Sequence, residues 1–195
     1  MKPVSVLFTL IAGVACVALA GPGSAIDGWF VAGSNPKDYD VGKDEKVLHS
    51  GKSSAFLQSN KEPIEGFGTL MQMIKADSYR GKRVRMTGYV KVDNIKGSAQ
   101  MWMRVDSKDS APQQLRFDNM GNRAISAPTD WKKCEIVLDV PGNSGAIAFG
   151  VLLAGTGKIW FDDVKFETVN LSVPTTDTKM APQYPGEPVN LGFEK

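Results

Sequence analysis

The sequence predicts an all-β protein: an antiparallel jelly-roll β-sandwich preceded by an N-terminal signal peptide. Beyond the first 25 residues, apolar side chains recur at every second position almost throughout, and no long stripe at helical spacing occurs. Short strand-like runs follow one another every 10–20 residues or so, roughly the spacing of a sandwich or barrel, with Gly, Pro and Asn turns between them. Closing many antiparallel strands into a double-sheet jelly roll protects their edges.

The N-terminal segment has the pattern of a signal peptide. Lys2 supplies a positive charge, and an apolar run follows from 4 to 20 that is short for a membrane span. Small residues in Ala18-Leu19-Ala20 and in Gly23-Ser24-Ala25 offer cleavage after residue 20 or 25. We therefore expect an exported protein, periplasmic or extracellular, that meets a membrane only through residues 1–25 before cleavage. A retained membrane anchor is the alternative.

Composition and charge exclude several classes of function. One histidine and two cysteines leave no ligand set for a His/Cys zinc site. A catalytic triad could only use His49, which has no motif around it. The net charge of +2 and the lack of a basic cluster predict no nucleic-acid partner. Export would remove Cys16, so Cys134 is expected to be a buried small hydrophobic residue.

Alternation places eight strands in one domain, from about residue 26 to 170. In the strand over 84–93, Val84 and Met86 face the core while Arg85 and Tyr89 face outward. A turn is expected over 93–97, and the Pro-containing stretch 171–195 is expected to be an extended tail. The predicted strands are 54–59, 68–76, 84–93, 98–106, 115–119, 132–140, 146–153 and 158–168.

Four motifs, in order along the chain, carry a family resemblance: 49–55 (HSGKSSA), 79–91 (YRGKRVRMTGYVK), 130–133 (DWKK) and 157–166 (GKIWFDDVKF). Together they resemble the galactose-binding-like jelly-roll domains of bacterial carbohydrate-binding modules, over most of Trp29 to Glu167. The resemblance implies the sandwich fold and makes carbohydrate the leading ligand class. It is less specific for function, because the same sandwich serves many roles.

The chain departs from that family at its opening strand. The family often opens with Asn-Leu-x-x-x-Phe-Glu, whereas a similar string, residues 190–194, lies here at the C-terminus. That string either folds back to supply the strand or begins a second module. The family's opening Glu and closing Asp often hold a structural calcium ion, so the displacement puts the ion in question. Asp162, on an apolar strand face, needs a partner: calcium, an arginine or backbone N–H groups.

The outward side chains of 84–93 and 98–106 are the candidate ligand site. If the two strands form a hairpin, one sheet face carries two aromatic rings with guanidinium and amide groups, as sugar recognition requires. The alternative is that a loop covers the rings as a second small core. The candidate ligand-binding residues are Arg85, Tyr89, Gln100, Trp102 and Arg104.

The other aromatic and acidic residues favour no enzyme. Trp131 is expected to plug an end of the sandwich and Trp160 to lie in the core, while Trp29 belongs to a loop that lines a binding rim or is buried. Asp106 and Asp118 could conceivably approach each other as a pair of catalytic carboxylates. The acidic stretch over 38–45 is expected to be a solvated loop. We therefore expect an exported, non-catalytic carbohydrate-binding module. The alternative is a structural or protein-interaction domain of the cell envelope.

Overall fold

The computed structural model describes residues 26–177 and 191–192, so the predicted signal peptide and most of the C-terminal Asn-Leu-Gly-Phe-Glu string lie outside the described residues. Within that part of the chain, no helix is long and apolar enough to cross a membrane. Two short 3-10 turns, Pro36–Asp38 and Gly121–Arg123, accompany the strands. The strands are β1 (Phe30–Gly33), β2 (Tyr39–Asp44), β3 (Ser54–Ser59), β4 (Phe67–Lys75), β5 (Lys82–Ser107), β6 (Gln114–Asp118), β7 (Thr129–Val140) and β8 (Ser144–Val169).

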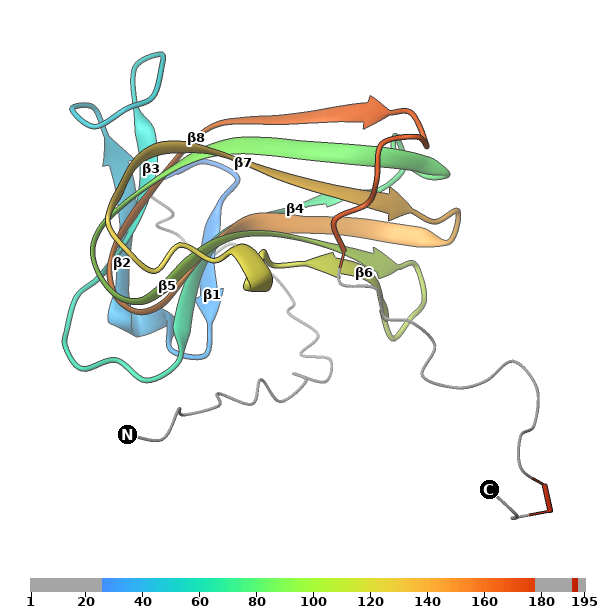
Figure 1. The fold of residues 1–195 in the computed structure, drawn as a ribbon, viewed down its shortest axis with the longest axis horizontal. Helices are drawn as coiled ribbons and strands as arrows, with labels where there is room; N and C mark the ends of the chain where they lie inside the picture. Colours follow the sequence, from blue (N-terminus) through green and yellow to red (C-terminus); the bar gives the residue numbers. More distant parts are fainter. Residues whose placement is uncertain (1–25, 178–190, 193–195) are drawn as a thin grey trace.

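The strands form two antiparallel layers, and both long strands belong to both layers (Figure 1). Layer A has the order β1-β4-β8-β5-β6 and uses the first half of β8 with the second half of β5. Layer B has the order β2-β3-β8-β5-β7 and uses the second half of β8 with the first half of β5. The jelly-roll-like sandwich predicted from alternation is thus confirmed as an antiparallel β-sandwich.

The predicted turn over 93–97 is wrong, because β5 runs on through it as it passes from layer B to layer A. Its partner β8 bends beside it, and Lys96 and Gly97 pair with Thr156 and Gly155. Glycine makes this possible: a Cβ on Gly97 would lie 2.0 Å from the Ala154 carbonyl oxygen, and one on Gly155 would lie 2.2 Å from that of Lys96. The two strands therefore stay hydrogen-bonded around the corner.

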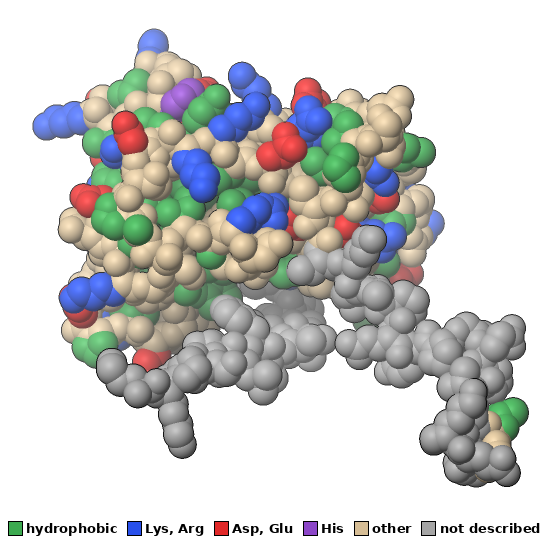
Figure 2. All heavy atoms as spheres, viewed as in Figure 1, with side chains coloured by type: hydrophobic (Ala, Val, Ile, Leu, Met, Phe, Trp, Pro, Cys, Tyr) green, Lys and Arg blue, Asp and Glu red, His purple; other side chains and the backbone are tan. Residues whose placement is uncertain are grey.

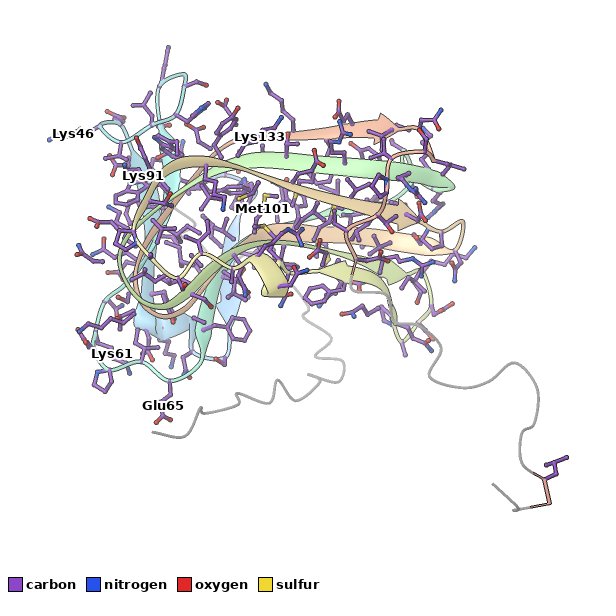
Figure 3. All side chains as sticks on the ribbon, viewed as in Figure 1. Lys46, Lys61, Glu65, Lys91, Met101 and Lys133 are labelled. Carbon is purple, nitrogen blue, oxygen red and sulfur yellow. The ribbon has the colours of Figure 1, made fainter. Side chains whose placement is uncertain are left out.

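The core fills the space between the layers with the alternate residues that the sequence pattern assigned inward. Val84 and Met86 are fully buried, and so is Met101, which Figure 3 shows between the two layers. Cys134 is 3% exposed, as expected, and burial raises the pKa of its thiol. The opposite positions of each strand point away from the core and form two outer faces, which we call the A face and the B face after their layers.

The segment before residue 54, predicted to be loops, contains two further strands. Trp29 packs edge-on against Phe149 and Phe161, with ring centroids 5.5 and 5.9 Å apart, and Tyr39 is 4% exposed in the core. Asp40 and Asp44 belong to β2, so the acidic stretch here is the outer side of an edge strand rather than a loop. Its Gly, Asn and Asp content obscured the alternation.

After β8 the chain crosses to the edge of layer B. The Arg83 guanidinium donates from Nη1 to the carbonyl oxygens of Leu171 and Val173, at 2.7 and 2.6 Å. The Thr176 N–H then donates to the Val137 carbonyl at 2.9 Å, and the Val137 N–H donates to Thr176 Oγ1 at 2.9 Å. This part of the predicted tail therefore covers the exposed edge of β7, which limits edge pairing with another chain.

Candidate functional site

The five predicted ligand-binding residues do not share a face. The two strand segments that carry them are not paired with each other, because β8 lies beside both and each segment belongs to a different layer. Gln100, Trp102 and Arg104 lie on the A face, and Arg85 and Tyr89 lie on the B face. The expected hairpin is therefore wrong, and only one half of the predicted set can form one surface.

The A face carries a second apolar cluster, separate from the core. Ala148, Met71 and Trp102 form its buried part, with 0%, 7% and 7% exposure. Half-buried side chains from the edge strands and from β8 pack around it, and Met73 beside them is 37% exposed. An outward sheet face of a lone domain is ordinarily polar. The residues around the buried part are Phe30, Ala32, Phe117 and Leu152.

Trp102 forms the floor of this cluster. From β5 its side chain reaches over β8 to β4, where indole Nε1 donates to Thr69 Oγ1 at 2.8 Å, and Thr69 Oγ1 donates in turn to the Val151 carbonyl at 2.7 Å. Gly150, opposite Trp102 on β8, lies close against β4, because a Cβ there would be 2.1 Å from the Leu70 carbonyl oxygen. The indole is thus held by a buried hydrogen-bond relay, and the cluster lies around it.

Polar groups stand at one side of the cluster. The Arg104 guanidinium donates to Asp106 Oδ2 from Nε at 3.0 Å and from Nη2 at 2.9 Å. The Arg104 side chain is 36% exposed, whereas that of Asp106 is 11% exposed. Gln100 is 5% exposed beside Trp102. Trp102 and Gln100 are therefore buried, and Trp102 belongs to a second small core, as the alternative expected. The groups left at the surface of the A face are the half-buried apolar side chains around Trp102 and the Arg104 guanidinium.

On the B face the aromatic rings are covered by polar side chains of the same chain. The His49 ring stacks on Tyr89, with centroids 3.5 Å apart and planes 16° apart. His49 Nδ1 lies 2.6 Å from Asp163 Oδ2, and Figure 2 shows the histidine at the surface. Arg85, the other predicted contact on this face, forms ion pairs with Glu135 at 3.2 Å and Glu167 at 2.8 Å.

Trp160 on the B face is also covered by a polar side chain of the same chain. It reaches over β3 to β2, where Nε1 donates to Asp44 Oδ2 at 2.8 Å. Lys158 Nζ lies over both aromatic rings, 4.2 Å from the Phe56 centroid and 4.5 Å from that of Trp160. The hydrogen bonds from Trp160 and from the Val47 N–H lower the pKa of Asp44 to about 2. Trp160 is buried as expected, but outside the core.

A bulge in β8 explains that placement. Asp163 has a φ of +51°, and the pairing with β5 shifts between Thr87 and Tyr89. The shift reverses the alternation. Trp160 therefore faces outward, while Val164 and Phe166, four and six residues further on, pack against the core. An unbroken alternation would have placed all three on one side.

Asp162 finds its partner in backbone N–H groups. Its Oδ2 accepts from the N–H groups of His49 at 2.8 Å and Ser50 at 3.2 Å, and its Oδ1 accepts from that of Asp163 at 2.7 Å. This is one of the three partners expected for a carboxylate at that position. Over residues 26–177 and 191–192, no three His, Cys, Asp or Glu side chains are grouped as a metal site. A calcium ion at Asp162 stays a prediction.

The two carboxylates considered for catalysis are held apart. Asp118 lies opposite Met103 on the core side of β6 and pairs with Arg123 at 2.6 Å, whereas Asp106 lies on the A face with Arg104. Trp131 lies beside His49, with ring centroids 5.7 Å apart. Among the described residues, these aspartates present no shared space for a glycosidic bond.

Sequence reasoning missed most of the A face. Phe30 lay in a predicted loop, while Met71, Met73 and Phe117 lay in predicted strands whose outward positions were not examined for apolar residues. The available signal was an apolar residue at both alternating positions, as in Leu70-Met71 of β4 and Leu152-Leu153 of β8. A strand with two apolar sides is buried on both or carries a binding surface on one.

The chain is similar in sequence to an uncharacterized HTH-type transcriptional regulator of Bacillus subtilis, with 46% identity over 169 residues. The match covers 86% of this chain but only 57% of the regulator's length. No family model matches the sequence.

Solved structures share the fold at low sequence identity. The CBM22-1 xylan-binding domain from Paenibacillus barcinonensis Xyn10C superposes with a TM-score of 0.54 and 17% identity, over 73% of this chain and 86% of that domain. The enzymatically active domain of bacteriophage CBA120 tailspike protein 4 superposes with a TM-score of 0.57 and 14% identity, over 73% of this chain and 20% of that protein. The described domain has the β-sandwich fold of the carbohydrate-binding modules.

Proposed function

We propose that this chain is an exported, non-catalytic module that binds polysaccharide on its A face. The observation that carries the proposal is the apolar cluster around Trp102 on the outer side of layer A, bordered by Arg104. A sugar ring has an apolar face that packs on such side chains and hydroxyl groups that accept or donate hydrogen bonds at its edge. The fold shared with a xylan-binding domain supports the same ligand class.

Export is supported by the apolar run over 4–20 and the small residues that follow it. The similar Bacillus protein raises a different use of such a chain, as one part of a longer transcriptional regulator. Fractionation of the native host and N-terminal sequencing of the mature protein separate the two. An N-terminus at residue 21 or 26 in the exported fraction supports the module, and an intact N-terminus in the cytoplasm contradicts export.

Binding is tested by native affinity electrophoresis of residues 26–195 in gels containing single polysaccharides. We expect retardation in at least one gel, and loss of that retardation in Met73→Gln and Phe117→Ala, whose side chains border the cluster without filling the core. Phe56→Ala, the matched aromatic change on the B face, should bind as the unmodified protein does. Equal loss in all three variants would contradict the site.

The second candidate function is a protein-interaction domain of the cell envelope, favoured by the exposed Met73 within an apolar cluster. The same variants decide between the two. Two results together would replace the carbohydrate proposal. The folded chain would not be retarded by any polysaccharide, and an envelope protein would capture it through Met73 and Phe117.

A further inference from the structure

We propose that Asp106 sets the charge preference of the A face, so that the site takes neutral polysaccharides and rejects chains that carry uronic acids. This inference rests on the proposed function and names the ligand class of the same surface. It comes from the charged side chains that border the Trp102 cluster and from the way in which two of them are paired.

Three charged groups lie on this side of layer A. Arg104 and Asp106 alternate on β5, and Lys75 lies on β4 opposite Ala146, which also pairs with Asp106. Lys75 therefore lies in the same cross-strand row as Asp106, whereas Arg104 lies one row closer to the cluster, opposite Ala148 and Phe117. Arg104 is thus the cation nearest to the apolar cluster in that register.

The charge of Arg104 is already paired with that of Asp106. Nε and Nη2 both donate to Asp106 Oδ2, and Nε also lies 2.8 Å from Oδ1. These contacts fix the guanidinium plane and occupy its Nε–Nη2 edge, so the other edge on which a carboxylate can bind, Nη1–Nη2, shares Nη2 with Asp106. Among the described residues, Arg104 Nη1 makes no hydrogen bond and can donate to a neutral hydroxyl group.

A uronic acid would meet two costs at this position. Its carboxylate would compete with Asp106 for Arg104 Nη2. It would also come close to the charge of Asp106, which is only 8% exposed and poorly screened by solvent. A neutral sugar meets neither cost. Discrimination through such a like-charge contact is a repulsive form of specificity.

The test compares a panel of neutral polysaccharides (xylan, mannan, galactan and mixed-linkage glucan) with polygalacturonate in affinity gels. The unmodified protein should be retarded by a neutral polymer and not by polygalacturonate. Asp106→Asn keeps the shape of the side chain and removes its charge, so affinity for polygalacturonate should rise at least about tenfold and fall again with added salt. The double variant Arg104→Gln with Asp106→Asn should lose that gain.

Asp130→Asn is the matched control, because it also releases a cation, Lys91, from an ion pair of 2.8 Å, but on layer B. An equal gain in this control would show an effect of net charge and overturn the inference. Asp106→Ser is the second variant: it removes the same charge at a position that is 8% exposed, with a smaller side chain. It too should gain polygalacturonate binding.

The outcomes separate the inference from the proposed function. If the unmodified protein binds a neutral polymer but neither variant gains polygalacturonate binding, the role of Asp106 is wrong and the carbohydrate site stands. Equal binding of both polymer classes by the unmodified protein also overturns it. If folded protein binds no polysaccharide, the proposed function fails, and the inference fails with it.

Discussion

The two outer faces of the sandwich each carry a tryptophan that is hydrogen-bonded in the same way, but the side chains around the two tryptophans differ. On each face a tryptophan reaches over the neighbouring strand and donates its indole N–H to the strand beyond, Trp102 to Thr69 and Trp160 to Asp44. Both are 7% exposed. Around Trp160 the neighbours are ionic, whereas around Trp102 they are aromatic and aliphatic.

This difference indicates which face keeps apolar side chains that the chain itself does not cover with polar groups. On the B face, Lys158 lies over Phe56 and Trp160, and His49 lies over Tyr89, so that the chain itself supplies the polar partner of each ring. On the A face, aromatic and aliphatic side chains surround Trp102, and Met73 is left 37% exposed. A buried indole on one face thus serves stability, and on the other it also supports the apolar surface that we propose as the ligand site.

The largest expected effect comes from exchanging each tryptophan for alanine. Because both indoles are buried and hydrogen-bonded, Trp102→Ala and Trp160→Ala should each lower the free energy of unfolding by about 3–5 kcal/mol. Urea unfolding measures this loss. Only Trp102→Ala should also abolish retardation by polysaccharide, measured at low temperature where both variants are folded. Equal binding by the two variants would break the comparison.

Asp44, which accepts the indole hydrogen bond on the B face, predicts a dependence of stability on pH. The folded pKa of Asp44, about 2, lies below its ordinary value of 3.8. Its ionised form therefore contributes stability at neutral pH, and that contribution is lost as the pH falls from about 5 toward 2. Urea unfolding across this range should show a shallower fall for Asp44→Asn than for the unmodified protein. Parallel curves would contradict the assigned partners.

A smaller effect is expected from Lys158→Met. The change keeps most of the aliphatic stem over Phe56 and Trp160 and removes the ammonium, so it should lower the free energy of unfolding by about 1 kcal/mol. Thermal unfolding checks it, and polysaccharide binding should not change. If binding were lost, the B face would take part in ligand recognition.

The smallest effect concerns calcium. Since three N–H groups already bind the carboxylate of Asp162, adding Ca²⁺ or EDTA should leave the melting temperature unchanged to within error. A rise with Ca²⁺ that disappears in Asp162→Asn would instead assign a structural ion to this residue. Differential scanning calorimetry in both buffers gives the answer.

Much of the fold was predictable because alternation is a local property. It placed Val84, Met86 and Met101 in the core, gave β3 its bounds, and correctly turned Trp102 and Arg104 outward. It failed at Asp163, where one extra residue reverses the two sides of β8. It also failed in β1 and β2, where turn-forming residues interrupt the pattern.

The sequence by itself determined the class of the fold and, in the strands where alternation is unbroken, which residues point inward and which point outward. Which outward residues share a face was decided by the tertiary structure, because period-two alternation describes one strand and says nothing about its neighbours. Pairing of β5 with β8 around the bend at Gly97 and Gly155 sends Tyr89 and Trp102 to opposite sides of the molecule. The A face exists only once β1, β4, β6 and both long strands are side by side.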